Sequence, residues 1–203
     1  NEDLLYLGTD NGAYVSFDRG ESWEVFSKEL PNVAVHDLVI QPEAKHLVLG
    51  THGRSLYIAD ISLLQKLNPK TMDEVVLAEM EPINFSPRWG SKFSTWGEVY
   101  EPKARIQFYS PKAGRANISI KNEEGKELRN ISMEANKGVN VLEYDLAISD
   151  PPAERAGKGK RVLENGDTKL KHAENGKFYP PKGKYKLTVT IEGKAADMPF
   201  EIK

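Results

Sequence analysis

The stretch Leu5-Tyr-Leu-Gly-Thr9 recurs 42 residues later as Leu47-Val-Leu-Gly-Thr51. With about one residue of slippage, Ala13-Tyr-Val-Ser16 then aligns with Leu56-Tyr-Ile-Ala59. Each copy contains two short apolar segments around a glycine-containing turn, which is the pattern of paired β-strands. Self-similarity at a fixed spacing is typical of repeat architectures, in which each repeat is a small unit that packs on its neighbours.

A period near 42 residues, with strands in each repeat, predicts blades of a β-propeller. Six strands are expected here: Leu4–Thr9, Ala13–Phe17, Glu24–Ser27, His36–Ile40, His46–Gly50 and Ser55–Ile61. They make about one and a half blades, whereas a propeller needs at least about four. We therefore expect residues 1–61 to be the last one or two blades of a partial β-propeller, completed by an N-terminal portion or by another chain.

The composition excludes several classes of protein. Of the 203 residues 39% are hydrophobic, and no apolar run approaches the roughly 18 residues of a membrane span. The chain has no cysteine, which excludes disulfides and thiolate metal sites, and its four histidines lack the spacing of metal ligands. We expect no metal and no cofactor. The 16 glycines and 12 prolines favour short strands and many turns over long helices.

Charge is distributed unevenly along the chain. Residues 1–60 carry a net charge of −6, whereas residues 101–203 carry +5. Seven Lys and Arg residues lie within residues 151–177 without a single aromatic residue. Because nucleic-acid-binding surfaces interleave aromatic side chains with their cations, we expect no nucleic-acid partner and interpret this basic stretch as a solvated loop.

The segment Ser16-Phe-Asp-Arg-Gly-Glu-Ser-Trp23 lies between the second and third expected strands. In a turn, the Asp can accept backbone N–H bonds, the Gly permits a positive φ, and the Trp can return to pack on the sheet. The segment resembles the Asp-box, or BNR repeat, of sialidase-like and sortilin-like propellers, in the residues Ser16, Asp18, Gly20, Ser22 and Trp23. In those families the box is structural and lies at a blade's edge. The resemblance implies a structural role for these residues and no catalytic role for Asp18.

The segment Gly50–Ile61 begins with Gly-Thr-His-Gly-Arg and resembles the closing blade of bacterial BNR and sortilin-like propeller proteins that are grouped with the glycosyl hydrolases. Serine follows Arg54 where that pattern has a second glycine. One interpretation places His52 and Arg54 at the mouth of the propeller, facing a ligand. In the other, Arg54 pairs with Asp60 or Asp37 and locks the ring closed.

Residues 62–102 join the two halves of the chain. Short helical segments are expected from Ser62, as the N-cap, to Leu67, and again up to Val76. Aromatic residues then follow at spacings of three or four: Phe85, Trp89, Phe93, Trp96 and Tyr100. They form either a sugar-stacking platform, with Trp89 and Trp96 facing the ligand, or an apolar cluster that fixes the linker on a neighbouring domain.

Residues 103–203 again alternate in short strands joined by glycine turns. Strands are expected at Ala104–Tyr109, Ala116–Lys121, Glu127–Met133, Asn140–Leu146, Lys184–Ile191 and Met198–Ile202, which predicts a small antiparallel β-sandwich. Gly138-Val-Asn140, Glu143-Tyr-Asp-Leu146 and Pro181-Lys-Gly-Lys-Tyr185 resemble the Ig-like domain found in flagellar hook-capping proteins and at the C-termini of secreted bacterial proteins. The resemblance implies an Ig-like β-sandwich with the basic stretch as an insertion at 147–180.

These features together predict an all-β chain: a partial β-propeller over 1–61, a linker over 62–102 and an Ig-like sandwich over 103–203. We expect the C-terminal part of a secreted, periplasmic or cell-surface bacterial protein. Its expected role is binding or scaffolding, with a carbohydrate or protein ligand and no catalytic residue of its own. The alternative is part of a glycoside hydrolase, sialidase-like or xyloglucanase-like, whose two catalytic carboxylates lie mostly in upstream blades.

Overall fold

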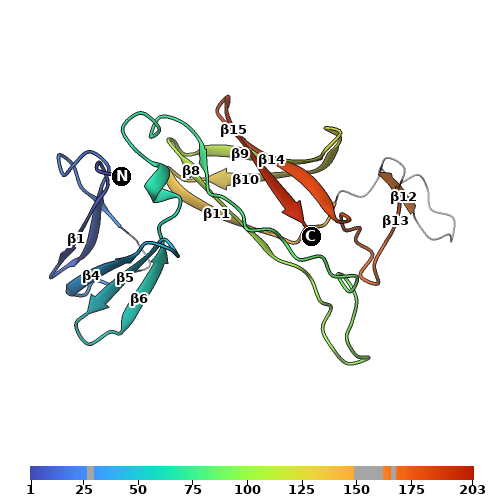
Figure 1. The fold of residues 1–203 in the computed structure, drawn as a ribbon, viewed down its shortest axis with the longest axis horizontal. Coiled ribbons are helices and arrows are strands. Elements are labelled where there is room, and N and C mark those ends of the chain that lie inside the picture. The colour runs from blue at the N-terminus through green and yellow to red at the C-terminus, as the bar shows by residue number, and fades with distance from the viewer. Residues whose placement is uncertain (27–29, 149–161, 166–167) are drawn as a thin grey trace. The chain divides into compact units, whose positions relative to one another are not determined.

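Two compact units make up the computed structural model, which describes residues 1–26, 30–148, 162–165 and 168–203 (Figure 1). The first unit comprises Asn1–Glu79 with Phe108–Pro111, and the second comprises Met80–Gln107 with Lys112–Lys203. The predicted all-β class is confirmed, because the described residues form several antiparallel sheets, none of which closes into a barrel. Among them, no helix is long and apolar enough to span a membrane.

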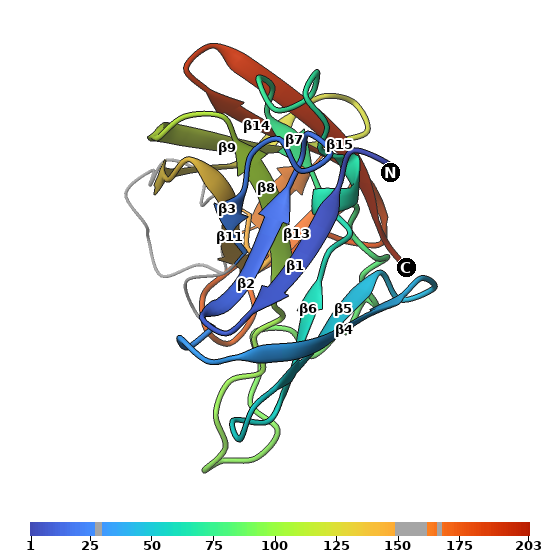
Figure 2. The same ribbon diagram turned by 90° about the vertical axis from the view of Figure 1, so that its left-hand side faces the viewer.

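The first unit contains two three-stranded antiparallel sheets of the same design (Figure 2). In each sheet every strand pairs with the next one in the sequence, so both are simple meanders. The first sheet has the order β1 (Leu5–Thr9), β2 (Gly12–Ser16) and β3 (Glu24–Val25). The second has the order β4 (Val35–Gln41), β5 (His46–Thr51) and β6 (Leu56–Asp60).

The two sheets share an apolar core. Since successive side chains on a strand point to opposite faces, every second residue is directed to the neighbouring sheet. The buried members are Ala13, Val35, Leu47, Leu49 and Ile61. Gly8 permits a close approach of the two sheets, because a Cβ built on it would lie 2.7 Å from the carbonyl oxygen of Val35. The first strands of the two sheets, β1 and β4, are therefore in backbone contact.

A second core of the first unit contains Leu4, Val15, Phe17, Leu63, Leu67, Ala78 and Tyr109. The predicted helix from Ser62 to Leu67 is wrong in type and extent: only the 3-10 turn η1 (Leu64–Lys66) forms, and Leu63 rather than Ser62 takes the N-cap position. Burial of Leu63 and Leu67 on either side fixes this turn, and the amide of Gln65 donates one further helical hydrogen bond to the carbonyl oxygen of Ile61 over 3.0 Å. No helix leads up to Val76 either, because β7 (Val76–Leu77) pairs with the end of β8.

A four-stranded antiparallel sheet in the order β10-β9-β14-β15 forms the main layer of the second unit. Its strands are β9 (Gly114–Asn122), β10 (Glu127–Ala135), β14 (Gly183–Ile191) and β15 (Lys194–Ile202). Alternate residues of β9, β14 and β15 are buried, among them Ile118, Leu187 and Phe200. The other face carries polar pairs such as Ser132 with Asn117. One face of the sheet is therefore built for a core and the other for water.

A second, smaller sheet in this unit pairs β8 (Ala104–Ser110) with β11 (Gly138–Tyr144), and the last residues of β8 belong to the first unit. The hairpin β12 (Val162–Asn165) and β13 (Thr168–Lys171) falls within the expected basic insertion at 147–180. Residues 149–161 and 166–167 of that expected insertion lie outside the described residues.

The segment expected as a linker, 62–102, is divided between the two units, because residues 62–79 pack in the first and residues 80–102 in the second. Within the second unit, Ile83 forms a parallel bridge with Ile202. The amide of Phe85 donates to the carbonyl oxygen of Lys203 over 2.8 Å. Residues 83–85 therefore extend the four-stranded sheet beside β15.

Candidate functional site

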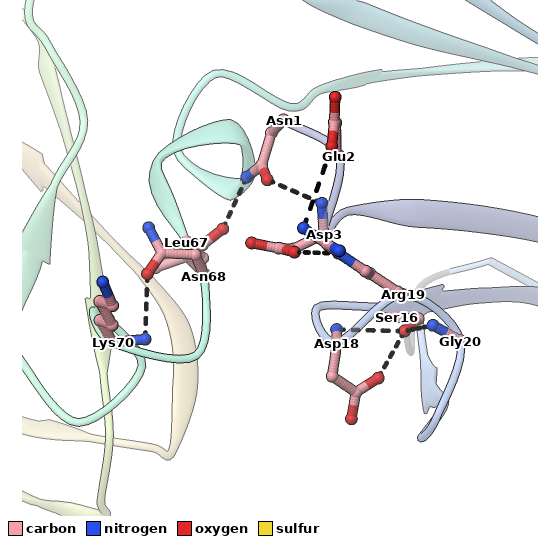
Figure 3. Close-up of polar contacts among 10 residues, drawn as sticks. All are labelled: Asn1, Glu2, Asp3, Ser16, Asp18, Arg19, Gly20, Leu67, Asn68 and Lys70. Carbon is pink, nitrogen blue, oxygen red and sulfur yellow. Dashed lines mark hydrogen bonds and ion pairs between the residues drawn. The ribbon is translucent and has the colours of Figure 1, made fainter.

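A dense set of hydrogen bonds closes the turn between β2 and β3 (Figure 3). The hydroxyl of Ser16 donates to Asp18 Oδ1 over 2.7 Å and accepts the amide of Gly20 over 2.7 Å. The amide of Ser22 donates to Asp18 Oδ1 over 2.9 Å, and its hydroxyl donates to Asp18 Oδ2. Both oxygens of the Asp18 carboxylate therefore accept hydrogen bonds from the turn that contains it.

These contacts change the acidity of Asp18. The hydroxyl of Ser22, its amide and the hydroxyl of Ser16 all donate to the carboxylate and lower the pKa of Asp18 to about 2. A hydrogen bond to the charged form favours ionisation, and burial contributes only a small opposing effect. Asp18 is therefore held as an anion whose lone pairs are used inside the turn, which suits a structural acceptor better than a proton donor.

Backbone geometry explains the glycine and the tryptophan of this turn. Gly20 has a φ of 92°, and the preceding Arg19 has a φ of 61°. The indole Nε1 of Trp23 donates to the carbonyl oxygen of Gly20 over 3.1 Å, and the ring lies against Gly20. Trp23 remains 39% exposed, so within the described residues only part of its surface is covered.

The turn is also tied to the start of the chain (Figure 3). Arg19 donates from Nε to Asp3 Oδ1 over 2.7 Å, and its amide donates to the carbonyl oxygen of Asp3 over 3.1 Å. Asn1 donates from Nδ2 to the carbonyl oxygens of Leu67, over 2.7 Å, and Gln65. The N-terminal residues therefore link this turn to the segment that follows the second sheet.

The turn between β5 and β6 carries two of the sequence-predicted ligand-facing residues, His52 and Arg54, and both are exposed. The ring of His52 makes an edge contact with the ring of His36, with centroids 5.2 Å apart. The alternative in which Arg54 pairs with Asp60 or Asp37 is not observed among the described residues. Asp60 and Asp37 instead accept the backbone amides of Ser62 and Leu38, so each is used locally.

Ser55 takes an unusual backbone conformation in this turn. Its φ is 92°, a region that glycine adopts more readily than any residue with a Cβ. The Ser55 carbonyl oxygen accepts the hydroxyl of Thr51 over 2.6 Å, and Gly53 has a φ of 72°. Residues 53 and 55 therefore both have a positive φ, as expected for glycines, although the second of them is a serine.

The two predicted tryptophans of the aromatic segment have opposite environments in the second unit. Trp89 is buried, with 4% of its surface exposed, and it contacts the rings of Phe85 and Tyr179. Trp96 is 96% exposed. The faces of Trp89 are therefore used in packing, whereas Phe93, three residues before Trp96 in the sequence, is 81% exposed.

Phe93 and Trp96 lie on a hairpin closed by backbone hydrogen bonds, Ser91–Tyr100, which is called the aromatic hairpin below. The amide of Tyr100 donates to the carbonyl oxygen of Ser91 over 3.0 Å, and Lys92 forms an antiparallel bridge with Val99. At the tip, the amide of Gly97 donates to the carbonyl oxygen of Ser94 over 3.0 Å. Trp96 is therefore the third residue of a four-residue turn.

The base of the aromatic hairpin is fitted against residues 173–179, which the sequence interpretation missed. Gly90 has a φ of 77°, and a Cβ built on it would lie 2.5 to 2.7 Å from atoms of Ala173, Asn175 and Tyr179. The amide of Asn175 donates to the carbonyl oxygen of Gly90 over 3.0 Å. Nothing in the local sequence signals this contact, except that a glycine lies between two groups of aromatic residues.

An ion-pair cluster adjoins this base. Lys177 Nζ lies 2.8 Å from both Glu101 Oε1 and Asp145 Oδ2, and Asn175 also donates to Glu101. Hydrogen bonds to the two carboxylates raise the pKa of Lys177, and the bond from Lys177 lowers the pKa of Glu101. Burial opposes ionisation of Asp145, but Lys177 and the amide of Ala147 outweigh it and lower the pKa of that carboxyl. The cluster joins three segments that are distant in the sequence.

One shallow hollow of about 400 Å³ lies on the first unit. It is lined by Asn11, Gly12, Ala13, Tyr14, Val25, Leu30, Pro31 and Asn32. This lining contains no carboxylate, amine or imidazole, so its described residues supply no acid–base pair. Across the described part of the chain, no three His, Asp or Glu side chains converge in a way that could hold a metal ion.

Comparisons with known proteins add little to this description of the site. No family model matches the sequence, and no curated protein matches it. A structural likeness is found to PorZ, described as an essential bacterial surface component of the type-IX secretion system of Porphyromonas gingivalis, with a TM-score of 0.29 and 12% sequence identity. The alignment covers 100% of this chain and 29% of PorZ, so the chain spans less than a third of that protein. A likeness at this level carries no argument about the fold or the function of the chain.

Proposed function

We propose that this chain is a binding or scaffold part of a secreted or envelope protein, in which the first unit supplies blades of a β-propeller and the second is an Ig-like β-sandwich. The observation that carries the proposal is that each of the two stacked sheets of the first unit has a row of exposed apolar side chains on its outer face, in addition to the apolar face that the two sheets share. A sheet with two apolar faces needs a layer on each side.

The outer face of the first sheet follows from its register. Leu7 pairs with Tyr14 and Tyr14 with Val25, so these side chains lie in one row across the sheet. Leu5 lies on the same face two residues earlier on β1. Leu5, Leu7 and Val25 are 39%, 43% and 62% exposed. This row is an apolar surface that no described residue covers fully.

The outer face of the second sheet repeats the pattern. Val39 pairs with Val48 and Val48 with Ile58, and Leu56 lies on the same face of β6. Val39, Leu56 and Ile58 are 55%, 68% and 67% exposed. The blades of a propeller stack face to face around an axis, so a blade with a neighbour on each side has apolar side chains to bury on both of its faces. The two open faces are what further blades would cover.

Two further features support this interpretation of the first unit. The sheets approach closely between their first strands, at Gly8 and Val35, as expected for strands nearest a propeller axis. The hydrogen bonds of Ser16, Asp18 and Ser22 also fit an Asp-box that stabilises its own hairpin. Since the Asp18 carboxylate is used in this way, we assign it no catalytic role.

For the second unit, the Ig-like proposal rests on corner contacts between strands. Tyr185 donates from its hydroxyl to the carbonyl oxygen of Pro181, as the corner tyrosine of many such sandwiches bonds to backbone a few residues upstream. Asn140 is buried and closes its own turn through bonds to Asn136 and Gly138. These residues belong to the segments that resemble the Ig-like domain.

The test of the blade proposal is association through the open faces. We expect the 203-residue chain to associate as its concentration rises, in sedimentation velocity runs, and Ile58→Lys to shift it toward monomer. Val141→Lys is the matched control, since Val141 is a valine on β11 that is 42% exposed in the other unit. A protease-resistant monomer at all concentrations would contradict the proposal.

The scaffold role is tested separately from the fold. The longest natural form of the protein should bind a ligand without turning it over, so incubation with a panel of polysaccharides should release no new reducing ends. Hydrolysis that is lost when carboxylates of a central pocket are replaced would instead favour the glycoside hydrolase alternative.

A further inference from the structure

We propose that His36 and His52 are the two protein ligands of a divalent first-row transition-metal ion, Zn²⁺ or an ion of similar preferences, with water completing its coordination. Both histidines belong to the second sheet of the first unit and the turn at its end, and their ring centroids lie 5.2 Å apart. The inference does not depend on the blade proposal, because it needs only this one sheet.

The first argument is the distance between the two rings. A Zn²⁺ ion lies about 2.1 Å from an imidazole nitrogen that ligates it, and therefore about 3.2 Å from the centroid of that ring. Two imidazoles at a tetrahedral angle on one ion then have centroids about 5.2 Å apart. The separation of the His36 and His52 rings matches this value, so an ion can be bound without moving either ring centre.

The second argument is that the ring nitrogens can be directed at a shared ion. The torsion χ2 of histidine has a broad, shallow profile, and its axis passes close to the centre of the ring. Rotation about χ2 therefore turns the nitrogens while the separation of the ring centroids stays nearly constant. Both side chains are exposed, so water can reach the ion and supply its remaining ligands.

The third argument is that the backbone holds the two histidines together. The register of β4 on β5 shifts between Val35 and Asp37, as at a β-bulge, and His36 is the inserted residue. The amide of His52 donates to the carbonyl oxygen of Ala34 over 2.9 Å, which joins the two segments beside this shift. Bulges redirect side chains and are frequent next to functional sites. The pair is therefore assembled by the backbone and does not need the ion to form.

The donor set decides which ions fit. Asp37 follows His36, and Arg54 lies two residues after His52; these are the two charged residues of segments 34–37 and 51–55, and their charges cancel. Attraction for the ion therefore comes from the imidazole nitrogens. Mg²⁺ and Ca²⁺ prefer oxygen ligands, whereas imidazole suits Zn²⁺, Cu²⁺ and Ni²⁺. We therefore expect the pair to select transition-metal ions.

Two protein ligands make this an open site. No third His, Asp or Glu side chain converges with the pair among the residues that the structure describes, so the other positions of a tetrahedral ion belong to exchangeable water. Sixteen positions separate His36 from His52 in the sequence, and ligand spacing therefore could not reveal the pair. It arises from the pairing of β4 with β5.

The experiment is isothermal titration of the 203-residue chain, without a purification tag, with Zn²⁺ and separately with Mg²⁺. We expect saturable binding of one Zn²⁺ per chain and no binding of Mg²⁺. His36→Gln or His52→Gln should weaken Zn²⁺ binding roughly tenfold or more, because a single imidazole lacks the second, intramolecular contact. His46→Gln is the matched control: His46 lies on β5 opposite Asp60, and its loss should leave the affinity unchanged. Circular dichroism checks that each variant is folded.

Three results would overturn the inference: no saturable heat with Zn²⁺ up to about 1 mM, unchanged affinity in His36→Gln and His52→Gln, or a loss in His46→Gln as large as theirs. The last result would place the ion on His46 and Asp60.

A measurement on the unsubstituted chain keeps the proposal testable if a glutamine variant unfolds. Zn²⁺ should shift the imidazole proton resonances of His36 and His52 in NMR spectra and leave those of His46 and His172 unchanged. Equal shifts at all four histidines would also overturn the inference. Failure of the blade proposal is detected separately, by the sedimentation of Ile58→Lys.

Discussion

The hydroxyl of Tyr185 donates to the carbonyl oxygen of Pro181 over 2.7 Å and fixes the corner where β14 begins. The ring is buried and stacks on Phe200 of the adjacent strand. Burial raises the pKa of Tyr185 to about 12, so the hydroxyl keeps its proton, and its hydrogen bond, to high pH. One side chain thus ties the loop before β14 to the core beneath it.

Tyr185→Phe should destabilise the second unit by about 1 kcal/mol, because it leaves the carbonyl oxygen of Pro181 without this donor. Urea unfolding followed by far-UV circular dichroism measures the change. Tyr100→Phe is the control, since Tyr100 is 53% exposed, and it should have no measurable effect. The raised pKa of Tyr185 also predicts a difference in the pH dependence of stability between the wild type and the variant. The wild type keeps its stability below pH 10 and loses it as pH rises toward 12, where an unfolded tyrosine ionises first, whereas Tyr185→Phe loses less.

Asp18 should titrate near its lowered pKa of about 2 rather than near the usual 3.8. A depressed pKa means that the carboxylate stabilises the turn above pH 3.8, and that this contribution disappears as the pH falls through about 2. The amide resonance of Ser22, which donates to Asp18, reports this titration by NMR.

In Asp18→Asn the low-pH shift of Ser22 should vanish, and the Ser22 and Gly20 amides should exchange faster with solvent. Glu21→Gln provides the control, because it removes a carboxylate from the same turn that takes no part in these bonds. If the amide resonance of Ser22 titrated with a midpoint near the ordinary pKa of an aspartate, the hydrogen bonds of the turn would not be stabilising the Asp18 carboxylate.

Gly90→Ala should destabilise the second unit by roughly 2 to 4 kcal/mol, since the added Cβ meets both a positive φ and overpacking. The Cβ would lie 2.5 Å from that of Ala173 and 2.7 Å from the ring of Tyr179. Gly176→Ala separates the two effects, because Gly176 has a φ of 79° but a Cβ added to it would meet no atom within 4 Å. Urea unfolding should show a smaller loss for Gly176→Ala. Equal losses would mean that the base of the aromatic hairpin is loosely packed.

Lys177→Gln should destabilise the second unit by about 1 kcal/mol, since the partly exposed cluster is screened by solvent. Without the cation the pKa values of Glu101 and Asp145 rise toward their ordinary range. The ionised carboxylates stabilise the fold until the pH falls through their folded-state pKa values. Because those pKa values are higher in Lys177→Gln, acid unfolding of the variant should begin at a higher pH than that of the wild type. Lys186→Gln is the control: Lys186 pairs with Asp197 at 2.6 Å with both side chains about half exposed, and we expect a smaller shift. Identical acid midpoints for the two variants would contradict the assignment.

Most strands could be predicted from the sequence because their signal is local. Alternation places β1 and β5 at the two copies of the repeat, and it places β9 and β14 within a residue or two of their observed ends. The helix expected after Ser62 failed because its apolar residues serve a core formed with Leu4 and Tyr109, which are far away in sequence. A capping pattern alone does not contain that information.

The environments of the aromatic residues could not be predicted for the same reason. Trp89 and Trp96 belong to one run of regularly spaced aromatic residues, and the local sequence does not indicate which of them would contact a ligand. Their difference arises from Tyr179, which packs on Trp89 from 90 residues further along the chain. The Lys177 cluster likewise joins three distant segments. Spacing identified the aromatic segment as notable, but only tertiary contact decides which ring faces solvent.

The burial of Trp89 also allows intrinsic tryptophan fluorescence to report on the unfolding of the chain. Its three tryptophans occupy three environments, with exposed fractions of 39% for Trp23, 4% for Trp89 and 96% for Trp96. Iodide should quench the emission of Trp96 in the native protein and leave that of Trp89 untouched until the second unit unfolds. Trp23 emits from the other unit, so fluorescence of single-tryptophan variants can follow the two units separately within one unlabelled chain.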